Sequence, residues 1–334
     1  MKKRIAALLC VVLVLASFAS CGSKETSLKI GQVIYAAHGK QCFSVITTVV
    51  SGDKIVKAFI DEYQYFAIGD DITGVPNSDA SFGEKFPEGQ VLGSKRVNNT
   101  YYSAHMKEAA GSTVALNTNY DAIQDYAAGK TISELEAAVS GKEASEVVDA
   151  VSGATLVDTP NYLLGIIEAA KAAQNNTEVL YDGDASKLSL HQVDGAAHGK
   201  QCFAVTTVLT DGTQVVLTWI DEYQFMSKEE NGVVGVPNSD ASFGEKFPEG
   251  QVLASKRQSN VYYSAHMAEA AGSTVALADN YNAIQSYCNG KTATELKDLV
   301  AKDASEVIDA VSGATLVDTA GYIKTVIEAI SSTK

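Results

Sequence analysis

The segment Asp149-Ala-Val-Ser-Gly-Ala-Thr-Leu-Val-Asp-Thr159 occurs twice in the chain, because residues 309–319 repeat it letter for letter. Each copy precedes a stretch with helical apolar spacing, and Thr159 or Thr319 is a good N-cap residue for that helix. In the first copy Pro160 follows at the first helical position, where its missing N–H is harmless. We therefore expect a tight turn of small residues at a helix entrance, a place with free backbone N–H groups that suits a phosphate. The apolar faces of the two helices comprise Leu163, Ile166, Ile167 and Ala170, and Ile323, Val326, Ile327 and Ile330.

The two copies are part of a tandem duplication. Corresponding blocks lie 160 residues apart, then 161 after a one-residue insertion, then 160 again at the repeated segment. Each repeat is long enough to bury a core of its own. We define residues 28–174 as the first unit and residues 188–334 as the second unit, joined by a polar linker at 175–187. Besides the repeated segment, matching blocks include 36–43 with 196–203, 74–92 with 235–253, and 101–106 with 262–267.

Within each unit the predicted strands come first and the helices last. Residues 41–50 and 54–61 are rich in β-formers and flank a Ser-Gly-Asp turn, which predicts a hairpin. Residues 74–92 contain two prolines and three glycines and predict a long irregular loop. Residues 101–106 alternate and predict a strand, and residues 120–128 predict a helix.

This segregation predicts an α+β fold of two tandem homologous domains, each a mainly antiparallel sheet with helices packed on it. A capping box, Thr131-Ile-Ser-Glu134, opens a short helix and recurs as Thr292-Ala-Thr-Glu295. The chain has no Gly-x-Gly-x-x-Gly fingerprint, which argues against a Rossmann dinucleotide site.

Residues 1–21 have the pattern of a signal peptide, with Lys2, Lys3 and Arg4 before a short apolar run. The sequence around Cys21 resembles a lipoprotein box, which predicts lipidation of Cys21 and a short polar spacer at 22–27. Phe18 replaces the usual leucine, so ordinary cleavage after Ala19 is the alternative. A lipid anchor would hold the chain at the outer face of the cytoplasmic membrane without spanning it.

Charge and cysteine usage exclude several classes of function. Loss of the leader, with three basic and no acidic residues, takes the net charge from −14 to −17, which argues against nucleic-acid binding. The remaining Cys42, Cys202 and Cys288 are too widely spaced for a disulfide framework, and we expect the first two to be buried thiols. The sequence carries no zinc, haem or iron–sulfur motif, so electron transfer would need an organic cofactor.

The repeated motif Asp-x-x-Ser-Gly-Ala-Thr resembles the acceptor motif of the FMN-binding domain family. In that family a flavin transferase attaches FMN through its phosphate to the last threonine, which implies two covalent FMN groups per chain, at Thr155 and Thr315. The small neighbours Gly153 and Ala154 leave the hydroxyl accessible, and the acidic residue and serine would order the turn or be recognised by the transferase. The other motif positions are Asp149, Ser152, Asp309, Ser312, Gly313 and Ala314.

A flavin ring also needs an aromatic or apolar surface and a few polar groups. Candidate ring contacts are Tyr101, Tyr102, His105, Met106, Tyr262, Tyr263, His266, Met267, His38 and His198. Ordinary packing of these side chains is the alternative. We interpret the Asp61–Glu62 pair, repeated as Asp221–Glu222, as a solvated strand end rather than acid/base machinery. The loop at 74–92 is either a lid over a ligand or a duplicated surface loop.

The family resemblance also implies a function. Such domains occur in flavin subunits of sodium-pumping NADH:quinone oxidoreductases and of Rnf complexes, and a lipoprotein leader with two units is similar to the two-flavin lipoproteins of extracellular electron transfer. This implies a carrier, without a substrate-specific active site, that takes electrons from a membrane quinol-linked donor to an extracellular acceptor. The alternatives are an electron-delivery subunit for one extracellular reductase and a non-redox tethered binding module or adhesin.

Overall fold

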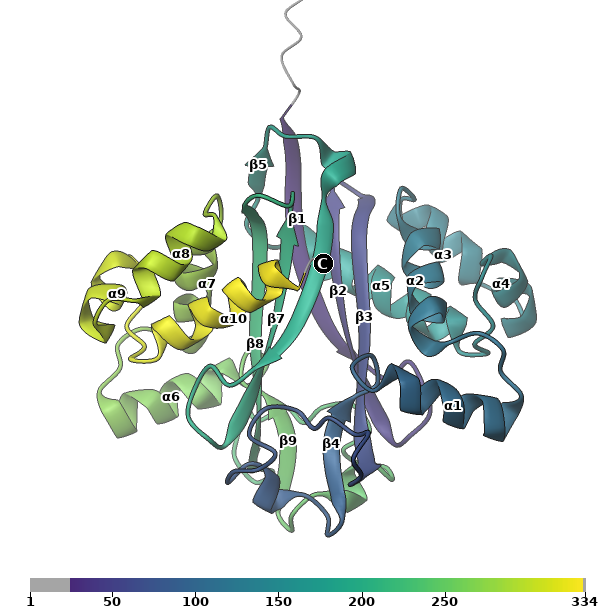
Figure 1. Ribbon diagram of the computed structural model, residues 1–334, viewed down its shortest axis with the longest axis horizontal. Helices are drawn as coiled ribbons and strands as arrows, with labels where there is room; N and C mark the ends of the chain where they lie inside the picture. Colours follow the sequence, from purple (N-terminus) through teal and green to yellow (C-terminus); the bar gives the residue numbers. More distant parts are fainter. Residues whose placement is uncertain (1–24, 333–334) are drawn as a thin grey trace, which may run out of the picture.

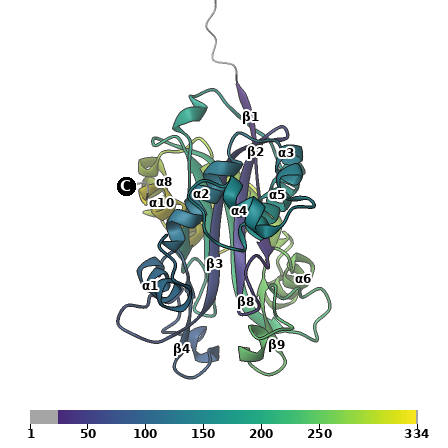
Figure 2. The ribbon, with the colours of Figure 1, turned by 90° about the vertical axis from the view of Figure 1, so that its right-hand side faces the viewer.

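The computed structural model of the protein describes residues 25–332 and contains two antiparallel sheets with helices outside them. The sheets face each other in the middle of the molecule, and the helices of each unit cover the outer face of that unit's sheet (Figure 1). Seen from the side of the first unit, helices α2 to α5 lie in front of its strands, and α1 lies lower, near β4 (Figure 2). The predicted α+β fold is confirmed.

The sheet of the first unit has the strand order β4-β3-β2-β1-β5, and that of the second unit β6-β7-β8-β9. All neighbouring strands are antiparallel. In the first sheet the strands are β1 (Thr26–Tyr35), β2 (Cys42–Ser51), β3 (Lys54–Ala67), β4 (Gln90–Ser94) and β5 (Val179–Tyr181). In the second they are β6 (Ser189–Gly195), β7 (Cys202–Thr210), β8 (Val215–Ser227) and β9 (Gln251–Ser255).

The central strands are buried on both faces. Every residue of β7, and every residue of β2 except its last, is buried, because helices cover one face and the other sheet covers the opposite face. This is why these strands carry apolar residues and threonines continuously rather than in alternation. The predicted hairpin is confirmed as β2 and β3, which Gly52 joins with a φ of 64°.

The helices follow the strands in each unit. In the first unit they are α1 (Asn99–Ala110), α2 (Leu116–Ala127), α3 (Ile132–Val139), α4 (Ala144–Ala150) and α5 (Thr159–Gln174). In the second they are α6 (Asn260–Ala271), α7 (Leu277–Cys288), α8 (Ala293–Val300), α9 (Ala304–Ala310) and α10 (Thr319–Ser331). Short 3-10 turns η1 (Gly83–Lys85), η2 (Ala185–Lys187) and η3 (Gly244–Lys246) lie in the connections.

The strand predicted at residues 101–106 is wrong, because these residues lie in helix α1, and their repeat lies in α6. The apparent alternation spans six residues only. In the helix Tyr102 and Met106 are four positions apart and pack toward the core of the first unit, while His105 is exposed. Gly111, with a φ of 67°, ends the helix in the left-handed region.

Other local predictions are confirmed. Both capping boxes form, with Thr131 accepting from the backbone of Glu134 and Thr292 from that of Glu295. The predicted helix at 120–128 is α2. The predicted apolar faces of α5 and α10 are buried: the exposed fractions are at most 1% on α5 and 7% on α10.

Each unit has a helix-covered core of its own, and two further clusters are shared between the units. The larger shared cluster is aromatic and fills the space between the sheets. There Phe43 lies 5.6 Å from Tyr223 and Tyr63 lies 5.6 Å from Phe203, between ring centroids. The two repeats therefore pack into one body through the inner faces of their sheets.

The linker and the cysteines complete the comparison with the sequence. The linker at 175–187 is more ordered than its polar composition suggests, since β5 pairs with β1 at the edge of the first sheet. Strand β1 begins at Thr26, within the predicted spacer. Cys42, Cys202 and Cys288 are free and buried, as predicted for the first two. The leader, Cys21 and most of the spacer lie outside the described residues.

Candidate functional site

The acceptor motif forms a loop between α4 and α5 in the first unit and between α9 and α10 in the second. Gly153 has a φ of 94°, in the left-handed region that favours glycine, and a Cβ atom there would lie 3.3 Å from Ala122 Cβ. Ala154 is buried and anchors the turn, whereas Thr155 is exposed. The loop therefore presents the Thr155 hydroxyl at the surface.

A buried asparagine orients this hydroxyl. Asn119 Oδ1 accepts from the Thr155 backbone N–H at 2.6 Å and from the Thr155 hydroxyl at 3.2 Å. Its Nδ2 group donates to two carbonyls at the start of α2, which fixes the orientation of the amide. Asn280 holds Thr315 with the same two distances. Because the hydroxyl donates its proton to Oδ1, its oxygen lone pairs remain available for a reaction.

The acidic residue and the serine of the motif do not order the turn in this structure. Asp149 and Ser152 are exposed, and among residues 25–332 neither side chain makes a hydrogen bond. The same holds for Asp309 and Ser312 over that range. Of the two roles left open by the sequence, recognition by another protein fits these side chains better.

The helix entrance differs from its prediction by one residue. Asp158 is the N-cap of α5, and Thr159 is the first helical residue, with its hydroxyl donating to the Leu156 carbonyl. The N–H groups of Ala154 and Thr155 are already bonded, to the Val151 carbonyl and to Asn119. The acceptor loop therefore offers fewer free backbone donors for a phosphate than expected.

The carboxylate of Asp158 instead contacts a predicted ligand residue. His38 Nδ1 lies 2.7 Å from Asp158 Oδ2, and His198 lies 2.7 Å from Asp318 in the second unit. Asp158 is three residues after Thr155, so one short loop carries both the acceptor hydroxyl and the partner of His38. This contact joins the acceptor loop to the loop that precedes β2.

A pocket of about 320 Å³ adjoins His38 in the first unit. Two aromatic residues predicted to contact a ring, Tyr102 and His105 of α1, form part of its wall. The remaining wall is the loop before β2 and one side chain of β3. Its lining residues are His38, Gly39, Lys40, Gln41, Cys42, Gln64, Tyr102 and His105. The structure thus brings together three of the predicted ring contacts of this unit.

Two predicted ring contacts do not line this pocket. Tyr101 packs edge-on against Phe66, at 6.0 Å between ring centroids, and Met106 packs against the core of the first unit. In the second unit the Tyr262 and His266 rings stack at 6.3 Å, and Met267 packs against the core of that unit. Tyr263 takes the place of Tyr102, with Lys256 Nζ 4.6 Å from its ring centroid.

A buried ion pair lies under the pocket. Lys95 Nζ is 2.6 Å from Glu62 Oε2 and 4.6 Å from the Tyr102 ring centroid, and both charged side chains are about 1% exposed. The hydroxyls of Tyr120 and Tyr162 each donate to Glu62 Oε2 at 3.2 Å. The second unit repeats the arrangement with Lys256, Glu222, Tyr281 and Tyr322.

The two partners of this ion pair keep each other charged. Burial alone would raise the pKa of Glu62, but the interactions with Lys95 and His38 and the hydrogen bonds from Lys95 and Ser44 together outweigh burial, and the pKa lies below its ordinary value. Burial alone would lower the pKa of Lys95, yet the Glu62 carboxylate raises it. Burial raises the pKa of the nearby Cys42 thiol to about 12, so this thiol is inert. The pocket therefore lies over a fixed, buried ion pair whose ammonium is 4.6 Å from the Tyr102 ring centroid.

The interpretation of Asp61–Glu62 as a solvated strand end is wrong. Asp61 is 4% exposed and Glu62 0%, because β3 continues to Ala67 and the pair lies in its middle. The Asp61 carboxylate accepts from the Ser94 hydroxyl at 2.6 Å and from two backbone N–H groups. Asp221 and Glu222 are buried in the same way. Each carboxylate faces its own partner, so the two do not act as a catalytic pair.

A second hollow, of about 450 Å³, lies beside the acceptor loop of the first unit. Ser152 forms part of its wall, together with Asp121 and Asp125 of α2. Arg96 forms an ion pair with Asp121, but Asp125 has no ion-pair partner among the described residues and repels a phosphate. The pocket beside His38 is therefore the better place for a phosphorylated ligand.

The loop at 74–92 is irregular up to Gly89, as predicted, and its last three residues belong to β4. It does not close over its own unit. Asn77 Nδ2 donates to the carbonyls of Gly199 at 3.1 Å and Cys202 at 2.7 Å, across the pseudo-two-fold axis. Asn238 does the same to Gly39 and Cys42, which line the pocket of the first unit.

Three pairs of residues at the site were missed by the sequence analysis: Asn119 and Asn280, Asp158 and Asp318, and Lys95 and Lys256. Their signal was present, because each recurs at the matching position of the two units, within repeated blocks. A repeated polar residue could have been either exposed or buried, and only the fold brings Asn119 to Thr155 from 36 residues away.

Comparison of the chain with protein-family models, with curated proteins and with solved structures gives no match. Within residues 25–332 none of the helices combines the length and apolar character needed to cross a bilayer.

Proposed function

We propose that the protein is a membrane-anchored extracytoplasmic flavoprotein that carries covalent FMN on Thr155 and Thr315. In this proposal it shuttles electrons from a membrane quinol-linked donor to extracellular acceptors. The observation that carries the proposal is the geometry of the acceptor loop: an exposed threonine hydroxyl, oriented by a buried asparagine on a glycine turn, occurs in both units.

The residues around this loop fit FMN. A phosphoester needs an accessible hydroxyl, which the exposure of Thr155 provides. A flavin ring needs an aromatic wall and a few hydrogen-bonding groups, and the pocket offers Tyr102 and His105 with the amides of Gln41 and Gln64. The contact between His38 and Asp158 fixes this pocket relative to the acceptor loop.

The side chains have separate tasks in this scheme. Asn119 keeps the Thr155 hydroxyl in place and accepts its proton in a hydrogen bond, so that the oxygen faces outward. Asp149 and Ser152 are exposed beside it and are available to the flavin transferase, which supplies the activated flavin nucleotide. When bound, the flavin supplies the electron chemistry, and the dipole of the Lys95–Glu62 ion pair beneath Tyr102 contributes to the electrostatic potential of the pocket.

Intact-mass analysis tests the proposal. The full chain co-expressed with a flavin transferase should gain two FMN masses and show the visible absorption of flavin. Thr155→Ala and Thr315→Ala should each remove one mass, and the double variant both. Thr118→Ala, an exposed threonine near the acceptor loop, is the matched control and should keep both.

Protein from the native host that carries flavin on neither threonine would refute the proposal. Colourless protein of this kind would favour a tethered binding module instead. Flavin on one threonine only would restrict the proposal to that unit.

A further inference from the structure

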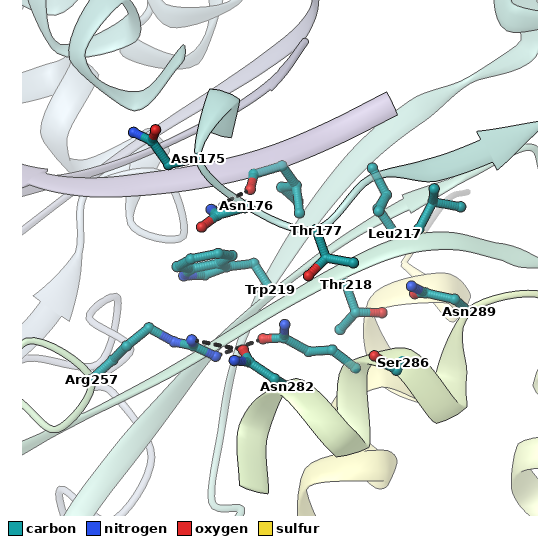
Figure 3. A pocket seen from close by; sticks show the side chains of 13 residues that line it. Asn175, Asn176, Thr177, Leu217, Thr218, Trp219, Arg257, Asn282, Ser286 and Asn289 are labelled. Atoms are coloured by element: carbon teal, nitrogen blue, oxygen red, sulfur yellow. Dashed lines mark hydrogen bonds between the residues drawn. The ribbon is translucent and has the colours of Figure 1, made fainter. Parts of the chain in front are cut away.

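A polar pocket of about 260 Å³ lies in the second unit, between the linker and helix α7 (Figure 3). Linker residues Asn176 and Thr177 form one side, and Asn282 and Ser286 of α7 form the other. In the view of Figure 3 the Trp219 ring lies between Asn176 and Arg257. The acceptor loop and the predicted ring contacts contribute none of the lining residues.

Arg257 brings a positive charge to this pocket that no ion pair neutralises within residues 25–332. Its guanidinium lies 4.4 Å from the Trp219 ring centroid. It donates to three neutral acceptors: the Ile220 carbonyl at 2.9 Å, Asn282 Oδ1 at 3.1 Å and Gln285 Oε1 at 2.8 Å. A guanidinium has five N–H donors, so two remain for a ligand.

The first unit neutralises the same charge. Arg96 Nη1 lies 3.0 Å from the carboxylate of Asp121, which corresponds to Asn282. In the second unit burial lowers the pKa of Arg257, and the carboxylate that opposes this lowering is Asp221. That carboxylate is already bonded by the Ser255 hydroxyl and by backbone N–H groups.

Two buried polar atoms of the pocket have no partner in the described part of the chain. Thr218 is 2% exposed, and its Oγ1 makes no hydrogen bond. Asn289 Oδ1 is buried and also unpaired. Alanines, Ala58 and Ala128, occupy the matching positions of the first unit. A buried polar group without a partner is destabilising, so a ligand that forms hydrogen bonds with these atoms gains affinity.

The substitutions between the units change the charge of the pocket: Leu217 replaces Lys57 and removes one ammonium, while two others remove carboxylates. Asp121 and Asp125 of the first unit become Asn282 and Ser286, which removes two carboxylates. Trp219 replaces Phe59 and adds an indole N–H donor. Loss of two carboxylates and one ammonium makes this surface more positive by one charge than its counterpart, where Lys57 and Arg96 balance Asp121 and Asp125.

We propose that this pocket binds a small hydroxycarboxylate. The free N–H donors of Arg257 and the Thr218 hydroxyl donate to the carboxylate, and the ligand hydroxyl donates to Asn289 Oδ1. The volume is below the range of about 300–1,000 Å³ typical of drug-sized ligands, which favours a molecule of a few carbon atoms.

The single tryptophan of the chain, Trp219, lies in the pocket wall and reports on binding. We would titrate the full, flavin-free chain with L-lactate and L-malate and follow tryptophan emission. A saturable change with at least one of the two is expected. Lactamide, which lacks the charge, should bind at least about tenfold more weakly, because hydrogen bonds from a guanidinium to a carboxylate are stronger than those to a neutral amide.

Asn282→Asp supplies the matched variant, because it recreates the Arg96–Asp121 pair that the same chain already tolerates. It should weaken lactate or malate binding at least about tenfold, the effect of about 1.4 kcal/mol. Asp121→Asn in the first unit should leave the emission titration unchanged. No saturable change with either hydroxycarboxylate, equal binding of lactamide, or full binding by Asn282→Asp would each overturn the proposal. Flavin attachment plays no part in these measurements.

Discussion

The two units agree at their acceptor loops and differ around their arginines. Thr155 and Thr315 are held by asparagines at identical distances, 2.6 and 3.2 Å. The Arg96 guanidinium forms an ion pair with a carboxylate, whereas the Arg257 guanidinium donates to neutral groups only among the described residues. The acceptor geometry thus depends on residues that both units share, while a few substitutions on the outer face change the charge that a ligand would meet.

A second difference lies between the sheets. The Tyr63 hydroxyl donates to Asp194 Oδ1 at 2.6 Å, whereas the hydroxyl of its counterpart Tyr223 is buried without a partner among the described residues. Ile34 stands in the first unit where Asp194 stands in the second. The pseudo-symmetry is therefore broken in the shared core as well as on the outer face.

The largest effect should come from a feature that the units share. Lys95→Met leaves the Glu62 carboxylate buried and unpaired, which should lower the free energy of unfolding by about 3–5 kcal/mol. Lys256→Met should lower it by a similar amount, measured by urea denaturation. Adding Glu62→Gln to Lys95→Met should recover most of the loss, because it removes the unpaired charge and the amide oxygen still accepts from Tyr120 and Tyr162. A loss below about 1 kcal/mol in one unit only would break the equivalence of the two sites.

A smaller effect should appear in the pH dependence of stability, through Asp194. Burial and repulsion by Asp61 raise the pKa of Asp194 to about 8, above the value of about 3.9 in an unfolded chain. The folded state then binds the proton more tightly, so this contribution to stability is full below about pH 4 and is lost as the pH rises to 8.

Asp194→Asn should remove this pH dependence and keep the hydrogen bond from Tyr63. Because Asp194 is only half-buried, we expect the stability difference between variant and wild type to change by about 1–2 kcal/mol between pH 5 and 9. Urea denaturation across that range measures it. If the free energies of unfolding of the variant and the wild type change in parallel with pH, the raised pKa of Asp194 is contradicted.

The next effect in size should come from the hydrogen bonds between the units. Asn77 has a φ of 64°, which glycine adopts freely, so Asn77→Gly removes only its two hydrogen bonds to the second unit. A loss of about 1 kcal/mol is expected. Amide hydrogen exchange should accelerate at residues 199–203, and Asn238→Gly should do the same at residues 39–43. Faster exchange confined to the mutated unit would argue against the inference that each asparagine stabilises the loop of the other unit.

The smallest effect concerns the arginines. Asn282→Asp should stabilise the protein by only about 0.5 kcal/mol, because the corresponding ion pair of the first unit joins Arg96 to the Asp121 carboxylate, which is 57% exposed. Thermal unfolding measures this gain. Asp121→Asn should produce a loss of the same size, and a much larger value for either would show that the two outer faces differ by more than one ion pair.

The duplication, the fold class and most helices were predictable from local signals. Apolar spacing located the buried faces of α5 and α10, and the capping boxes located the starts of α3 and α8. The helix α1 was missed because the six residues 101–106 alternate by chance. A longer window that adds Ala109 and Ala110 favours a helix.

The site was predictable only in part. The sequence identified the exposed threonines and three of the pocket residues, but nothing local places Asn119 against Thr155 or buries Lys95 under Tyr102. Charged pairs such as Asp61–Glu62 are usually exposed, so their burial depends on partners, Lys95 and Ser94, that β4 brings from more than 30 residues away.

Asn77 and Asn238 each donate hydrogen bonds to the loop before the second strand of the other unit, so each unit depends on its neighbour. A polypeptide with a single repeat would lose the support of its own pocket loop unless it paired with a second copy of itself. The duplicated chain behaves as a homodimer fused into one molecule, in which assembly no longer depends on concentration and each half is free to acquire differences that a true dimer would have to share.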